Sequence, residues 1–205
     1  MLLAKTLTAI LVINGFLSFG CQKSDFSTTN KVVTSPLPTP EDPAQVSQKE
    51  YDAMLAVMHD GPIVVRTKTE ATAAGAEASF LAKEFPGLPL DAIEDFKKKN
   101  AKVVSVECKF PTEQPCSLFT DDDIQAIWDF KHGGNANEKW EGFSSKYGTR
   151  YYYSISRVGF SSDGTKALAY AIGTCGTLCR NFNYYYLTKE SSSWKIAKTV
   201  LTGVE

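Results

Sequence analysis

Four cysteine thiols are the side chains of this 205-residue chain that are best suited to chemistry. They are Cys108, Cys116, Cys175 and Cys179. A zinc site needs about four nitrogen or sulfur ligands, and His59 and His132 are the only histidines that could help to supply them. The last two cysteines have the spacing C-x₃-C, one residue longer than the usual thiol–disulfide exchange motif. We therefore predict structural disulfides, and we expect no metal and no cofactor.

A fifth cysteine, Cys21, ends an apolar N-terminal segment. Lys5 gives the segment a basic start, and residues 6–19 are almost uniformly apolar. This run is shorter than the roughly 20 residues that cross a bilayer as a helix. The segment resembles the export signal of bacterial lipoproteins, although Ser18 stands where those signals favour leucine. The resemblance implies cleavage after residue 20, acylation of Cys21 by a lipid such as palmitate, and a place in the cell envelope. An ordinary secretory signal and an uncleaved anchor are the alternatives.

Export would place the remaining four cysteines in an oxidising compartment, where disulfides persist. Four cysteines permit three pairings, and sequence alone does not choose among them. We expect the local pairing, Cys108 with Cys116 and Cys175 with Cys179. Two prolines favour a turned loop in the first interval, and Gly176 permits a tight return in the second.

Acidic and histidine side chains offer a hydrolytic alternative, although no catalytic residue is assigned. The run 121–123 could hold a cation, but acids in the first turn of a helix also interact favourably with the helix dipole. His59 and His132 lie before glycines at predicted helix ends, where local structure accounts for them. An envelope hydrolase whose acids converge only in three dimensions therefore stays open as an alternative. The acids that could take part are Glu107, Glu113 and Asp163.

Arg157 and two runs of tyrosine are the candidates for binding. Arg157 interrupts an apolar strand and, if buried, must be paired, because an isolated buried charge is costly. An ion pair with Asp163 or with an acid on a helix is the alternative to ligand recognition. The tyrosines at 151–153 and 184–186 place phenols on both faces of a sheet, so one face could meet a protein or a sugar. The possible binding residues are Tyr152, Arg157, Tyr184 and Tyr186, with plain sheet building as the alternative for the tyrosines.

The composition indicates one folded domain that is preceded by a tether. Hydrophobic residues make up 43% of the chain, which is ample for one core. The 22 basic residues do not exceed the 23 acidic ones, so we expect no nucleic-acid partner. Residues 22–42 are rich in serine, threonine and proline. We predict a signal peptide at 1–20, a lipid-anchored tether at 21–45 and a single globular domain at 46–205.

Hydrophobic periodicity predicts an α+β fold. Helices are expected at 47–58, 71–84, 91–99, 120–132 and 140–147, and strands at 63–69, 103–108, 151–160, 167–173, 182–188 and 194–200. Short connectors make the last four strands antiparallel. The helices would thus be N-terminal and pack on a C-terminal antiparallel four-stranded meander with one additional early strand. The expected core residues are Leu55, Phe80, Phe96, Trp128, Phe143, Ile155, Leu168, Ile172 and Trp194.

The C-terminal half resembles a set of uncharacterised bacterial exported proteins. The resemblance lies in the segments 156–160 (SRVGF), 167–170 (ALAY), 175–176 (CG) and 194–196 (WKI). It implies a shared fold over nearly the whole domain and no activity. We therefore expect a membrane-tethered envelope lipoprotein with a non-enzymatic binding or structural role. The lipid would attach it to a membrane, which we expect to be the outer membrane if the cell has two. Its other partner would be an envelope protein or a glycan.

Overall fold

The computed structural model describes residues 44–71, 75–128, 135–176 and 178–205, without the side chain of residue 128. They belong to one compact unit, Pro40–Glu205. The predicted signal peptide, Cys21 and nearly all of the predicted tether lie outside the described residues, as does His132. Among the helices that are described, none is long and apolar enough to cross a membrane.

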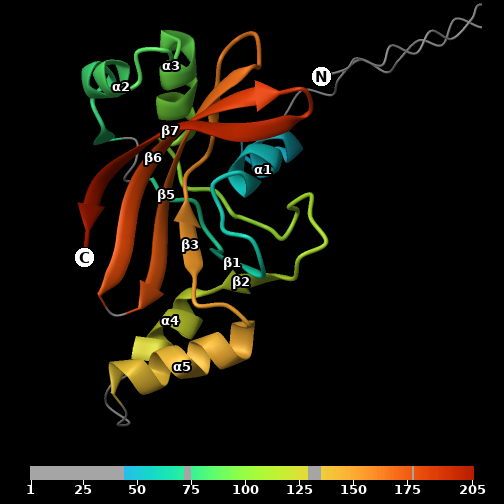
Figure 1. Ribbon diagram of the computed structural model, residues 1–205, viewed down its shortest axis with the longest axis vertical. Coiled ribbons are helices and arrows are strands. Elements are labelled where there is room, and N and C mark those ends of the chain that lie inside the picture. The colour runs from blue at the N-terminus through green and yellow to red at the C-terminus, as the bar shows by residue number, and fades with distance from the viewer. Residues whose placement is uncertain (1–43, 72–74, 129–134, 177) are drawn as a thin grey trace, which may run out of the picture. The chain divides into compact units, whose positions relative to one another are not determined.

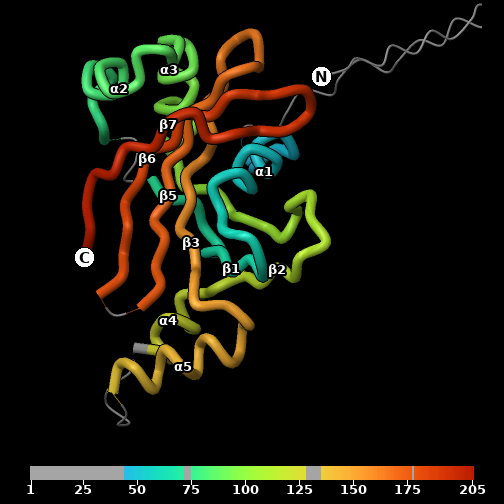
Figure 2. The backbone as a smooth tube through the Cα atoms, in the orientation of Figure 1, coloured from blue at the N-terminus to red at the C-terminus, as the bar shows by residue number. Residues whose placement is uncertain are grey.

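A mixed sheet of seven strands organises the unit (Figure 1). Its strands are β1 (Ile63–Arg66), β2 (Cys116–Phe119), β3 (Tyr152–Ile155), β4 (Gly159–Phe160), β5 (Lys166–Gly176), β6 (Cys179–Glu190) and β7 (Ser193–Val204). They lie in the order β2-β1-β3-β5-β6-β7, with β4 also paired to β5. β1 runs parallel to both β2 and β3, whereas the other pairings are antiparallel. Figure 2 follows the chain through the long meander of β5, β6 and β7.

Helices pack on both faces of this sheet. They are α1 (Gln48–Leu55), α2 (Ala78–Glu84), α3 (Leu90–Lys99), α4 (Asp121–Trp128) and α5 (Ala136–Tyr147). The first of them, α1, packs on one face with Ala167, Ala169 and Leu187, and we call this the α1 face. On the opposite face, α2 and α3 lie against β5 and β6, and α4 and α5 against β1 to β3. We call this the covered face.

The α+β class is confirmed, but two details of the prediction are wrong. The sheet is larger than a four-stranded meander with one extra strand, and it contains parallel pairs. The helices also do not all precede the sheet, because β1 and β2 lie between them in the sequence. Parallel pairing joins segments that are far apart in the chain, so no short connector indicates it in the sequence.

Individual strands also differ from the prediction. The segment 103–108 forms only an isolated bridge between Lys68 and Ser105, and the unpredicted strand β2 follows it at 116–119. The expected strand 151–160 is divided into β3 and β4. The strand is interrupted where two backbone amides donate to side chains rather than to a neighbouring strand. The Arg157 amide donates to Asn100 Oδ1 (2.8 Å), and the Val158 amide donates to Glu50 Oε1 (3.1 Å).

Most of the expected core residues are buried. Phe96, Phe143, Ile155, Leu168, Ile172 and Trp194 are all in the interior. Leu55 is only half-buried, and the expectation for Phe80 is wrong, since that ring is 37% exposed. The helix α2 begins only at Ala78 and turns Leu81 inward instead. The side chain of Trp128 lies outside the described residues.

Two disulfides join segments close in sequence, so the prediction of disulfides is confirmed. Cys108 is bonded to Cys116 with their Cα atoms 5.7 Å apart, which fixes the preceding loop to the start of β2. Cys175 is bonded to Cys179 with a Cα separation of 5.1 Å, which closes the β5–β6 hairpin.

Candidate functional site

Arg157 lies between β3 and β4 and is almost entirely buried, with 3% of its surface exposed. Its Nη2 donates to Glu50 Oε2 at 2.7 Å, and its Nε donates to Glu50 Oε1 at 3.0 Å. The same Nη2 also donates to the carbonyl of Gln45 at 2.8 Å. This two-point contact matches the planar guanidinium to a carboxylate. The internal ion pair, rather than a ligand, therefore accounts for Arg157.

Glu50 is therefore the acid on a helix that was one of the two expected partners of Arg157. It sits at the third position of α1, where it also accepts from the amide of Ser47 (3.0 Å) in a capping box. Asp163, the other candidate partner, instead accepts hydrogen bonds within its own turn. It accepts from the Ser161 hydroxyl (2.6 Å) and the Thr165 amide (2.9 Å), and these bonds lower its pKa to about 2.

The three tyrosines proposed for binding lie on the covered face. Tyr152 is buried with Phe119 and Phe143 under α5, and Tyr184 is buried against Tyr170 and Phe96. Tyr186 is half-buried and donates its hydroxyl proton to the carbonyl of Gly87 at 2.9 Å. These contacts favour the sheet-building alternative for all three.

The alternate residues of the same two runs, Tyr151, Tyr153 and Tyr185, lie on the α1 face. Beyond the C-terminal end of α1 this face holds a pocket of about 290 Å³. We call its wall the open patch. It consists of Tyr151, which immediately precedes β3, and of the sheet residues Tyr153, Gly173, Asn181, Asn183, Tyr185, Ile196 and Thr199, with residues 56–59 at its rim. Its volume is at the lower limit of ligand pockets, which span roughly 300–1,000 Å³.

The open patch is aromatic and polar but carries no Asp, Glu, Lys or Arg among its lining residues. The ring of His59 lies 4.5 Å from that of Tyr151, centroid to centroid, and its backbone amide donates to the Tyr153 hydroxyl (3.0 Å). Burial raises the pKa of Tyr153 to about 12. Burial also raises the pKa of Tyr185, against an opposing hydrogen bond from Asn183. Both phenols are therefore uncharged at physiological pH, and the hydroxyl of the buried Tyr153 is already engaged with the His59 amide.

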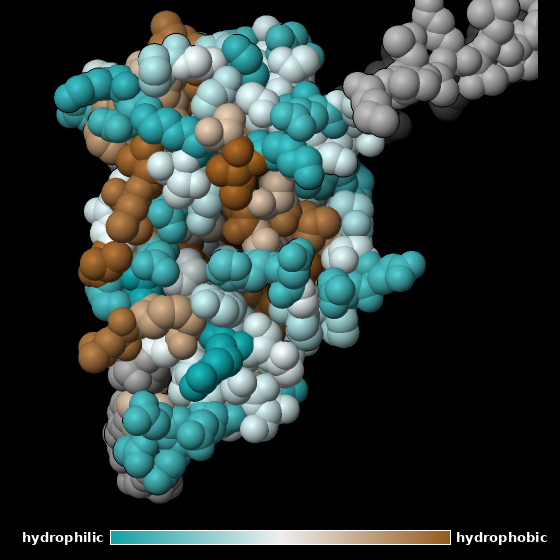
Figure 3. All heavy atoms as spheres, in the orientation of Figure 1, coloured by the Kyte–Doolittle hydropathy of each residue, from teal (hydrophilic) through white to brown (hydrophobic). Residues whose placement is uncertain are grey.

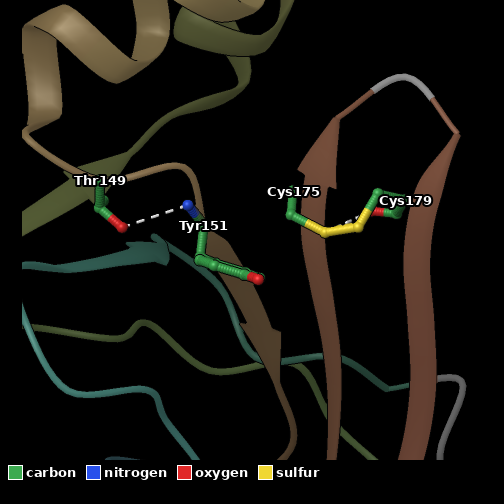
Figure 4. The surroundings of a disulfide bond; sticks show 4 residues. All are labelled: Thr149, Tyr151, Cys175 and Cys179. Carbon is green, nitrogen blue, oxygen red and sulfur yellow. Dashed lines mark hydrogen bonds between the residues drawn. A yellow bond between two sulfur atoms is a disulfide. The ribbon is translucent and has the colours of Figure 1, made fainter.

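A disulfide supports one end of the patch. Tyr151, whose amide donates to Thr149 Oγ1 (3.2 Å), extends its ring toward the hairpin that Cys175 and Cys179 close (Figure 4). Because β5 and β6 carry Gly173, Asn181 and Asn183 just beyond this link, the disulfide fixes the two strands at the point where the patch begins.

Apolar side chains continue the α1 face along the free edge of the sheet. Ile196, Leu201 and Val204 of β7 are 44%, 57% and 65% exposed. Leu201 and Val204 pair with Asn183 and Asn181, so they project on the same side as the open patch. Figure 3 shows hydrophobic side chains gathered along this edge.

The acids of the hydrolytic alternative do not come together. Each of five pockets lined by described residues contains at most one carboxylate, and the pocket that contains His59 has none. Asp123 completes a capping box with Thr120 at the start of α4, and these bonds lower its pKa. Across the described ranges, no three acidic, histidine or cysteine side chains are grouped as a metal site requires.

Each of the two predicted tyrosine runs is divided between the two faces of the sheet. Tyr151, Tyr153 and Tyr185 were within the runs, and alternation separates them from their neighbours. The sequence does not show where the helices pack, and their packing decides which set of alternate tyrosines is covered. No signal pointed to Asn181, Asn183 or His59 as parts of the same surface.

Comparison with known proteins gives no further identification of the site, because no family model, no curated protein and no solved structure matches this chain.

Proposed function

We propose that this chain is a lipid-anchored protein of the bacterial cell envelope that binds an envelope protein or glycan through the open patch. The observation that carries the proposal is the set of uncharged aromatic, amide and hydroxyl groups on a sheet face that α1 covers only in part. Tyrosine and asparagine suit recognition because a flat ring and an adaptable amide make contacts at little entropic cost. The position of the chain in the envelope rests on the resemblance of residues 1–21 to a lipoprotein signal.

The hydrolytic alternative receives less support. Glycoside and ester hydrolysis by side chains requires a second acid, or a histidine beside an acid. The pockets described above supply neither arrangement. Binding needs only the surface that is present.

Photo-crosslinking in living cells tests the binding role. We expect a photoreactive side chain at position 199, within the patch, to capture a partner, and the same group at exposed Glu94 on α3 to capture none of it. Adding Asn183→Ala and Tyr185→Ala should lower capture from position 199 by at least about ten-fold, since two central contacts are removed. The matched control is Leu90→Ala, which truncates a side chain that is 62% exposed on α3.

Two outcomes would contradict the binding role. One is equal capture from position 199 with and without the two substitutions. The other is an equal loss of capture with Leu90→Ala. A captured species that is degraded by glycosidases rather than by proteases would identify the partner as a glycan.

A further inference from the structure

A second pocket, of about 640 Å³, lies where α3 ends and the following loop begins. Lys98, Lys102 and Val103 contribute to its wall, together with Ala44 at the start of the described chain and the buried Arg157. It is more than twice the volume of the pocket in the open patch. Its lining holds four cationic side chains and a single acid, Asp95.

Two of the four cations are neutralised inside the fold. Arg157 is paired with Glu50, and Lys99 Nζ lies 2.9 Å from Asp95 Oδ2 and donates to the carbonyl of Val158 (3.1 Å). Lys98 and Lys102 are exposed, and among the described residues neither has an acid within 4.0 Å. The rim of the pocket therefore carries two cations that have no ion-pair partner among the described residues.

The helix dipole explains only one of these lysines. Lys98 is in the last turn of α3, where a cation is favoured, but Lys102 lies three residues beyond the end of the helix at Lys99. The dipole effect falls off within the last turn. Next to Lys102, Val103 is 52% exposed. Cations flanking an exposed apolar side chain are the combination that binds the surface of an anionic bilayer.

The described chain begins beside this pocket. Ala44, which lines the pocket, is joined directly to the segment that carries Cys21. In a chain anchored at Cys21, the end of the tether and the two lysines thus lie on one side of the unit. Tethering raises the effective concentration of a weak membrane-binding surface at the bilayer.

We propose that Lys98, Lys102 and Val103 form a docking surface for anionic phospholipid headgroups of the membrane in which the chain is anchored. Its biological role rests on the lipid anchor in the proposed function, but the surface itself is separable from both the anchor and the open patch. Docking would hold the domain in one orientation against the bilayer rather than free on its tether.

Flotation with vesicles tests the docking surface without the lipid anchor. The chain from residue 22 onward keeps every contact of the compact unit Pro40–Glu205. We expect it to float with vesicles of equal parts phosphatidylglycerol and phosphatidylcholine, and not with phosphatidylcholine alone. Each lysine near an anionic surface strengthens partitioning about five-fold. Lys98→Gln with Lys102→Gln should therefore weaken partitioning about twenty-five-fold, and Lys98→Arg with Lys102→Arg should restore it.

A matched control removes two cations elsewhere, with Lys139→Gln and Arg150→Gln near α5, which covers a different part of the sheet from α3 (Figure 1). These changes should leave flotation within about two-fold. Equal loss in the control would show that net charge, not this surface, drives binding, and would overturn the proposal. So would flotation that survives the two glutamines, or saturable binding of soluble glycerol phosphate with no preference for vesicles. Each of these results leaves the crosslinking test of the open patch unaffected.

Discussion

At the scale of single residues, Glu50 and Arg157 connect two segments that are distant in sequence, residues 45–50 and residues 157–158. The carboxylate caps α1, accepts from the backbone between β3 and β4, and holds the guanidinium, whose other bond reaches the carbonyl of Gln45. Sequence predicted that a buried arginine here must be paired, because the surrounding residues are apolar. It could not predict Glu50, since the pairing spans 107 residues and depends on the packing of α1.

We expect Arg157→Met to lower the free energy of unfolding by about 3–5 kcal/mol, because it leaves the Glu50 carboxylate buried without its cation. Urea denaturation measures the change. The control is Arg180→Met, which breaks an ion pair with Glu205 whose side chains are 40% and 61% exposed. Exposed pairs contribute about 0–1 kcal/mol. If Arg157→Met cost no more than the control, the ion pair would not be its main role, and ligand recognition by Arg157 would reopen.

At the scale of elements, the local patterns were informative and the long-range pairings were not. Turns and alternation located the three long strands β5, β6 and β7, and apolar spacing located α1 and α5, although α5 begins at Ala136 rather than at the expected residue 140. The strand β2 was missed because four residues give too little alternation, and its partner β1 lies some fifty residues earlier. The same limit applies to the tyrosines, because the packing of α1, α3 and α5 decides which of them are covered.

One glycine fixes how closely α3 approaches the sheet. A Cβ atom added at Gly159 in β4 would lie 2.3 Å from the amide nitrogen of Phe96 and 2.4 Å from the carbonyl oxygen of Ala92. Both are backbone atoms of α3, so no side-chain rotation can relieve the overlap. We expect Gly159→Ala to cost at least the upper end of the roughly 1–3 kcal/mol that overpacking takes from a core.

Thermal unfolding measures this cost, and α5 supplies the control. Gly142 is exposed and has no atom within 4 Å of an added Cβ. Gly142→Ala should therefore stabilise the protein by about 0.5–1 kcal/mol, the difference between glycine and alanine in a helix. A tolerated Gly159→Ala would mean that α3 packs farther from β4 than the structure has it.

At the scale of the whole molecule, the proposed anchor and the proposed docking surface act on the same membrane through different physics. An acyl chain on Cys21 is held by the hydrophobic effect, which salt does not screen. The lysines at 98 and 102 act through charge, which is screened over about 10 Å at 0.1 M salt. Salt therefore separates the two contributions to membrane association.

We expect the native chain to stay with washed membranes at both low and high salt, and its intact mass to exceed that of the polypeptide from Cys21 onward by acyl groups. Cys21→Ala, behind an export signal that is cleaved without lipidation, should lose that mass. It should keep a weak membrane association that high salt releases, because only Lys98 and Lys102 remain to hold it. Adding Lys98→Gln and Lys102→Gln should release the Cys21→Ala chain at low salt as well. A native chain without added mass would contradict the anchor alone. A Cys21→Ala chain released equally with and without the two glutamines would contradict the docking surface alone, so membrane fractionation decides each part separately.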